Sequence, residues 1–297
     1  MSNRAGLKMG ILTTAALSLL AVGCRKGLDD QGQIGASVGD VMASADESAN
    51  SNGSTAMLPA LPVIRTPDEL KGPVWRRALE AVFPSAYAAS CTDVTFSACA
   101  AGVRTRTFSS CSIGTATLDG SATLTFSDTV ACTLGTSGDS VNRTASLTLT
   151  GLYGGTLAVS SPGGGQTLTK TDAGWTFAVP GMERVLTGPG GHTLFDIGTA
   201  TTSPIVMTGT TRADFVIVSG ALVVTHNLAG YSVTLEPHDL AWATTCNCAV
   251  SGSLTGTVSG GKADGKSATV TITGCGRADV DIDGDTESVV LDRCAAI

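Results

Sequence analysis

From Cys91 to the C-terminus, β-branched and aromatic residues alternate with polar ones, and this period of two constrains the fold more than any other feature of the chain. The clearest runs span residues 121–127, 145–151, 174–179, 214–220, 231–236 and 267–273. Alternation places successive side chains on opposite faces of a strand. Threonine, valine and the aromatic residues also favour strands. The pattern predicts a β-rich domain over residues 91–297.

Short glycine-rich and aspartate-rich segments separate these runs. They are Asp119-Gly120, Ser137-Gly138-Asp139, Gly163-Gly164-Gly165, Gly188-Pro189-Gly190-Gly191 and Asp283-Gly284. Such segments form tight turns between antiparallel strands. We therefore expect about fifteen to eighteen short strands in an all-β, antiparallel β-sandwich. The sandwich would consist of either two packed sheets with Greek-key links or two small modules.

Nine cysteines limit the possible folds further. Setting Cys24 aside, an even set of eight remains: Cys91, Cys99, Cys111, Cys132, Cys246, Cys248, Cys275 and Cys294. In an oxidising compartment such a set predicts four disulfides. Proximity across hairpins favours a pair between Cys111 and Cys132. It leaves Cys248 and Cys294 as competing partners for Cys275.

Cys246-Asn247-Cys248 is the only close cysteine pair. Zinc and thioredoxin-like sites use CxxC spacing or nearby histidines, and this segment has neither. A disulfide framework is the better interpretation.

The N-terminus has the layout of a secretion signal. Arg4 and Lys8 precede an uncharged, mostly apolar run over residues 9–23 that ends in small residues, as in signal peptides. A helix of this run would be about 22 Å long, short of the roughly 30 Å core of a bilayer. We therefore predict that residues 1–23 are a signal peptide and not a transmembrane helix.

The segment Leu20-Ala21-Val22-Gly23-Cys24 resembles the lipobox of bacterial lipoproteins. Ala21 stands where a branched aliphatic residue is commoner. The resemblance implies cleavage before Cys24 and attachment of acyl chains such as palmitate to that cysteine, which would hold the protein on a membrane. Arg25 stands where an aspartate would resemble an inner-membrane retention signal. This favours the outer membrane, with the domain facing the periplasm or the cell surface.

Two further segments precede the β-rich domain. Residues 24–65 would form a lipid-anchored flexible linker, because the stretch up to about residue 60 is rich in small and polar residues and contains few large apolar ones. Such a coil spans roughly 35 Å on average. Thr66-Pro67-Asp68-Glu69 is typical of a helix start. Apolar residues at helical spacing follow, so residues 66–90 would contain one or two short helices.

The charge of the chain bears on its partners. Removal of residues 1–23 takes two of the 18 basic residues and none of the 25 acidic ones, which leaves a net charge of about −9. Nucleic acid is a poor partner for such a protein. We expect the membrane as a partner through the lipid, together with an unknown protein or polymer ligand.

Several short motifs match catalytic patterns. Residues 260–267 match the phosphate-binding pattern GxxxxGK[ST], yet a strand-like run follows where a phosphate loop needs a helix. Gly35-Ala36-Ser37-Val38-Gly39 matches GxSxG inside the expected linker, where no strand and helix would frame the serine. The chain has three histidines, His192, His226 and His238, which are far apart in sequence. We assign no catalytic residue.

An acidic segment near the C-terminus is the most informative polar cluster. Its residues Asp279, Asp281, Asp283, Asp285 and Glu287 resemble the DxDxDG core of calcium loops. Val290 stands at position twelve, where an EF-hand has glutamate. The alternative is a hairpin in which Val280 and Ile282 point inward, the aspartates face water, and Asp283-Gly284 forms the turn. Calcium is therefore a possible cofactor, and we expect no other.

Together these features predict a membrane-anchored extracytoplasmic lipoprotein. We expect a non-enzymatic binding or structural module of the cell envelope. A calcium-dependent adhesin and a secreted hydrolase are the alternatives.

Overall fold

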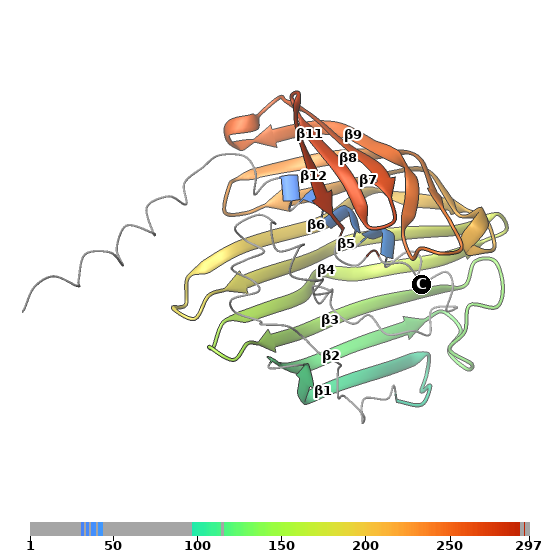
Figure 1. The fold of residues 1–297 in the computed structure, drawn as a ribbon. Helices are drawn as coiled ribbons and strands as arrows, with labels where there is room; N and C mark the ends of the chain where they lie inside the picture. Colours follow the sequence, from blue (N-terminus) through green and yellow to red (C-terminus); the bar gives the residue numbers. More distant parts are fainter. Residues whose placement is uncertain are drawn as a thin grey trace, which may run out of the picture.

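The computed structural model describes residues 31–32, 34–35, 37–39, 41–43, 97–113, 116–291 and 294. Its main feature is a 12-stranded antiparallel sheet in which each strand pairs with its neighbours in the sequence. The sheet curls strongly, so that β7–β12 turn over one face of β3–β6 (Figure 1). The edges are β1 and β12.

The strands are long, with six to sixteen residues each. Two 3-10 turns interrupt the series, η2 (Arg212–Asp214) and η3 (Gly261–Ala263). The strands are β1 (Val103–Ile113), β2 (Ala116–Phe126), β3 (Ser140–Thr150), β4 (Thr156–Thr171), β5 (Gly174–Thr187), β6 (Thr193–Thr208), β7 (Val216–His226), β8 (Tyr231–Trp242), β9 (Ala249–Gly260), β10 (Ser267–Gly274), β11 (Arg277–Ile282) and β12 (Asp285–Val290).

The expected all-β, antiparallel and disulfide-linked fold is confirmed, and all six alternating runs coincide wholly or mainly with strands. The connections differ from the expectation. Every link joins adjacent strands of one continuous open sheet, so the core lies between parts of a single curled sheet and no Greek-key link occurs among the described strands.

Two expected turns lie inside strands, which explains why there are fewer and longer strands than predicted. Gly120 is within β2, beside a register shift between Phe108 and Cys111 of β1. Gly165 is within β4, where three extra residues bulge out opposite β3. Both glycines have positive φ, and a Cβ on either would meet a backbone oxygen of β3 at about 2 Å. These glycines permit bulges and close backbone approach, whereas 137–139, 188–191 and 283–284 are true turns.

The enclosed face of the sheet forms the hydrophobic core. In β3, residues from Val141 to Leu149 alternate between buried and more exposed positions, with the apolar side chains on the enclosed face. The same alternation recurs in β2 and β8. Burial of one face at period two fixes the strand register, because a slip of one residue would expose the whole apolar set.

A helix lies on the enclosed face of the sheet, and we call it the buried helix. It comprises the described residues 31–32, 34–35, 37–39 and 41–43, all of them buried. Figure 1 shows it in blue, beneath the β11–β12 end of the sheet. Ile34, Val38 and Met42 are each at most 2% exposed and join the core. The predicted flexible linker over 24–65 is therefore wrong for these residues.

The linker prediction fails because a short helix needs few apolar side chains of its own when it packs on a large apolar sheet. Ile34, Val38, Val41 and Met42 recur at helical spacing, and the sheet supplies the rest of the buried surface. Composition averaged over the segment hid this short stripe.

Three disulfides connect described residues: Cys99–Cys132, Cys246–Cys275 and Cys248–Cys294. Cys111 is also disulfide-bonded, to none of these six. The disulfide framework is confirmed, but the predicted pairs are wrong. Cys132 bonds to Cys99 and not to Cys111, and Cys275 bonds to Cys246 and not to either candidate.

Several predictions fall outside the described residues. They include the signal peptide over 1–23, lipidation of Cys24, the bond of Cys91 and the short helices over 66–90. Among the described residues, none of the helices combines the length and apolarity that a transmembrane helix requires.

Candidate functional site: the acidic hairpin and the buried helix

The acidic segment forms the β11–β12 hairpin at one edge of the sheet. Its register pairs Asp279 with Ser288 and Asp281 with Thr286. Asp283 and Gly284 make the two-residue turn, with φ of 57° and 88°, as in the tight hairpins that favour Asp-Gly. Val280 is fully buried. The structure thus has the hairpin geometry that the sequence offered as the alternative to a calcium loop.

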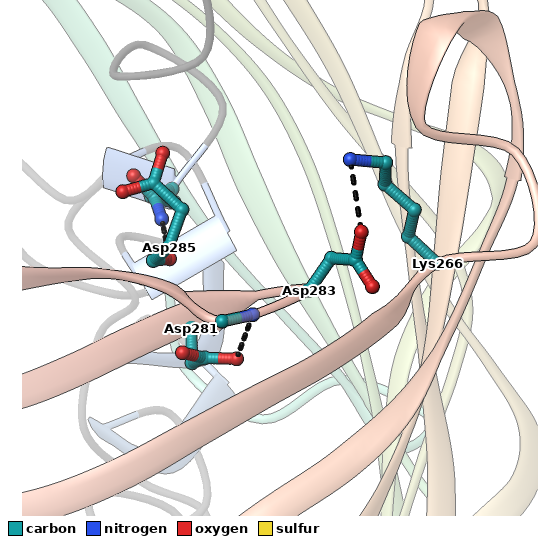
Figure 2. A network of polar contacts seen from close by, with 6 residues as sticks. Lys266, Asp281, Asp283 and Asp285 are labelled. Carbon is teal, nitrogen blue, oxygen red and sulfur yellow. Dashed lines mark hydrogen bonds and ion pairs between the residues drawn. The ribbon is translucent and has the colours of Figure 1, made fainter.

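Asp281 organises the turn (Figure 2). The Gly284 N–H donates to Asp281 Oδ1 at 3.0 Å, and the Thr286 hydroxyl donates to Asp281 Oδ2 at 2.6 Å. These two bonds, the Thr286 bond first, lower the pKa of Asp281, because they stabilise the charged form. On the same face, the Ser288 hydroxyl donates to Asp279 Oδ1 at 2.5 Å.

Asp283 points toward the neighbouring β9–β10 turn. Its carboxylate lies 3.1 Å from the ammonium group of Lys266, and both side chains are about half exposed. Figure 2 shows this ion pair bridging the two turns. Lys266 belongs to the segment that matches a phosphate loop, and strand β10 follows it. The expected hairpin turn is therefore confirmed for that segment.

The other side of the hairpin faces the buried helix. The Gln31 amide donates to Val280 O at 3.2 Å and to Asp285 O at 2.5 Å. Glu287 is paired in register with Val280, so its side chain lies on the enclosed face. Strand alternation thus divides the five predicted calcium ligands: Asp279 and Asp281 lie on the outer face, and Glu287 lies on the inner one.

Two of the predicted calcium ligands already have partners within the protein. Asp281 already accepts two hydrogen bonds and Asp283 is paired with Lys266. Among the residues that the structure describes, no group of three or more histidine, cysteine, aspartate or glutamate side chains is placed to hold a metal ion. Calcium binding at Asp279, Asp281, Asp283, Asp285 and Glu287 stays a prediction.

Calcium should raise the melting temperature if the hairpin binds it, because a cation would relieve repulsion among the carboxylates. The measurement is a thermal melt of the full chain with and without about 1 mM calcium, the range of weak extracellular sites. The Asp279→Asn variant is the control and should lose the shift. An unchanged melting temperature in the parent chain would contradict the prediction.

The contribution of Asp281 to stability should depend on pH. Because its pKa is lowered in the folded chain, the contribution is complete above the unfolded value of about 3.9 and is lost as pH falls through the folded value. Asp281→Ala should therefore melt below the parent at pH 6, and the difference should shrink toward pH 3. Asp172→Ala, in the exposed β4–β5 turn, is the control. A difference that is constant with pH would show that the carboxylate charge is not involved.

The histidines and the GxSxG serine lie in separate places. His226 packs against Tyr231 at 5.3 Å between ring centroids, and His238 shares a hydrogen bond with Thr255 at 2.7 Å. His192 is exposed in the β5–β6 turn. Ser37 is 3% exposed within the buried helix, and a nucleophile elbow would instead present its serine between a strand and a helix.

Sequence reasoning missed a set of arginines on the enclosed face. Arg143 is 1% exposed in β3, and Arg104 lies on the same face of β1, because the register aligns both with buried Leu124. Arg106, two residues along β1, is 5.1 Å from the Phe108 ring, and burial lowers its pKa. The sequence pattern could have predicted the burial of Arg143, because this arginine stands between Val141 and Ala145 at a position that the alternation assigns to the buried face.

Comparison of the chain with models of protein families, with curated proteins and with solved structures found no match.

Proposed function

We propose that the protein is a lipid-anchored, extracytoplasmic module of the cell envelope, with a binding or structural function and without catalytic activity. The observation that carries the proposal is the contrast between Cys24 and the other cysteines. Cys24 follows a signal-like segment in a lipobox, whereas the seven described cysteines are all disulfide-bonded. Structural disulfides form in oxidising compartments, so the two features support the same location.

The buried helix supports the proposal further. Its first described residue, Gln31, is seven residues after Cys24. Gly35 approaches Val289 of β12, and Gly39 approaches Leu291 just after it. The described residues nearest to Cys24 in the sequence are thus part of the folded domain. A lipid on Cys24 would therefore be joined to the sheet through only a short segment, which suits a module held at a membrane.

We propose a protein or a polymer as the ligand. The protein itself would lie on the outer membrane, with its β-rich domain facing the periplasm or the cell surface. A calcium-dependent adhesin would use the outward carboxylates Asp279 and Asp281. A secreted hydrolase could not combine His192, His226 and His238 in one active site, because they lie on different strands and turns. It would need an active site built from other residues.

The test is mass spectrometry of the mature N-terminus after expression in a bacterial host with a lipoprotein pathway. We expect a peptide that begins at Cys24 and carries acyl chains, and a protein that sediments with membranes. The Cys24→Ser variant should carry no lipid and should be released or remain unprocessed, with its disulfides and melting temperature unchanged. An unmodified Cys24 in the mature parent protein would overturn the proposal.

A further inference from the structure

We infer that one end of the curled sheet lies on the membrane and inserts exposed apolar side chains among the lipid headgroups. The inference rests on the proposed lipidation of Cys24 and adds an interaction surface to it. The surface consists of the turns at 151–155, 188–192 and 227–230 together with Leu194, and we call it the anchor-side rim.

The topology places these turns together. In a sheet whose strands follow the sequence order, every second turn lies at the same end. The β3–β4, β5–β6, β7–β8, β9–β10 and β11–β12 turns therefore share one end, and most can be followed along the left side of Figure 1. The ion pair between Lys266 and Asp283 joins the last two of them directly.

Exposed apolar side chains gather at this end. Six large ones are exposed in the described part of the chain, and four of them belong to the anchor-side rim: Leu152 (60%), Tyr153 (64%), Leu194 (45%) and Leu228 (52%). Isolated exposed leucines need no explanation, but these occur at three successive turns of one end. Val130 and Val218 lie toward the opposite end. Leucine and tyrosine are suited to the boundary between headgroups and acyl chains.

The attachment of the chain brings the same end to the membrane. The Gln31 side chain is 2% exposed and is bonded to the carbonyls of Val280 and Asp285 beside the β11–β12 turn. Seven residue steps separate it from Cys24, and they span at most about 25 Å. The acylated cysteine lies at the membrane surface. The backbone of Gln31 therefore stays within about 25 Å of Cys24, and the β11–β12 hairpin is held to it by the Gln31 side chain.

Distances within the sheet allow the rim to reach the surface together with this turn. Strands are spaced about 4.8 Å apart, which puts the β7–β8 turn roughly 19 Å and the β3–β4 turn roughly 38 Å from the β11–β12 turn along the curled sheet. Once the lipid holds one turn near the membrane, the contacts of the other turns become intramolecular, so they cost little further translational entropy. Lys262 and Lys266, both exposed at this end, can face lipid phosphates.

The charge of this end makes a lipid surface a better occupant than a strongly basic or acidic protein. The β9–β10 turn, the β11–β12 turn and the first residue of β12 contain two lysines, Lys262 and Lys266, and three aspartates, Asp264, Asp283 and Asp285, so the charge of this corner is nearly balanced. The turns of the anchor-side rim itself contain no aspartate, glutamate, lysine or arginine. Contact with phosphatidylcholine headgroups then requires little removal of water from fixed charges.

The test uses the full lipidated chain in phosphatidylcholine vesicles that contain brominated acyl chains. A fluorescent non-natural amino acid replaces Tyr153 in one sample and Val130, 85% exposed near the opposite end, in the other. We expect several-fold stronger quenching of the probe at 153. Replacing Leu152, Leu194 and Leu228 with serine should remove most of that difference, whereas Val218→Ser should not.

The outcomes separate this inference from the proposed function, because the mass of each sample reports its lipidation. Equal quenching at 153 and 130 in a lipidated sample would overturn the inference and leave the anchor intact. An unmodified Cys24 would remove the basis of both. The third outcome concerns the Cys24→Ser chain without vesicles. If that chain dimerises and its probe at 153 is shielded from water, a second copy covers the rim, and the inference is overturned.

Discussion

Replacing Cys248 and Cys294 with alanine should lower the free energy of unfolding by about 4 kcal/mol, the chain-entropy value for a loop of this length. The bond joins residues 46 apart and both cysteines are fully buried. It closes the loop that contains β9 to β12 and attaches the end of the chain to the start of β9. A loss of this size is a large fraction of the 5–15 kcal/mol that stabilises a typical domain.

The same replacement should loosen the buried helix. Both sulfur atoms lie 3.8 Å from the carbonyl oxygen of Gly39, so the disulfide forms part of the surface on which the helix packs. Amide hydrogen exchange should increase over residues 31–43. The matched control is the Cys99–Cys132 pair, which closes a loop of similar length, 33 residues, beside β1 and β2. Its removal should lower stability by a similar amount and leave exchange of the buried helix protected.

Equal exchange of the buried helix in the two variants would contradict this specific role of the Cys248–Cys294 bond. The measurement is a denaturant titration of each variant for stability, combined with exchange under native conditions. Cysteine pairs are replaced together so that no free thiol is left to form a wrong disulfide.

Gly35→Ala should destabilise the protein by about 1–3 kcal/mol, the usual cost of overpacking a core. A Cβ at residue 35 would lie 2.6 Å from Cγ2 of Val289, closer than such atoms approach. In an exposed helix the same change would be favourable by about 1 kcal/mol, because alanine is the better helix former. The sign of the measured effect therefore tells whether the helix packs against β12.

A double-mutant cycle makes this prediction specific. Val289→Ala removes the atom that the new Cβ would meet, so Gly35→Ala should cost little or become favourable in that background. We expect a coupling energy above about 1 kcal/mol, well outside the 0.3–0.5 kcal/mol scatter for independent sites. Additive effects would show that residue 35 and Val289 are not in contact.

The local pattern of the sequence was sufficient for the strands. Alternation in 121–127, 145–151 and 231–236 predicted β2, β3 and β8, because the period of a strand is a property of the backbone and needs no distant partner. The Asp283-Gly284 turn and the inward Val280 followed for the same reason. Turn residues were less reliable. Gly120 and Gly165 lie at bulges inside strands, and only the pairing of β1 with β2 and of β3 with β4 distinguishes a bulge glycine from a turn glycine.

The candidate site could be predicted only in part. The sequence placed Asp279, Asp281 and Asp283 on one hairpin, but the direction of Glu287 toward the core follows from its cross-strand pairing with Val280. The burial of Arg143 was readable from its position in an alternating run. The bond from Gln31 to the hairpin was not readable, because the two segments are separated by about 250 residues.

The amino-acid sequence alone is enough to show the period of the β domain, the number of cysteines available for disulfides and the signal-like N-terminus. The cysteine pairs 99–132, 246–275 and 248–294 and the buried helix within residues 31–43 became known from the three-dimensional fold. The disulfide pairing and the buried helix both depend on contacts between segments that are distant in the sequence. Disulfide formation requires Cβ atoms within a few ångströms of each other, and a short helix is stable only against a surface that buries its apolar side. Such proximity is a property of the curled sheet as a whole, which no local stretch of residues encodes.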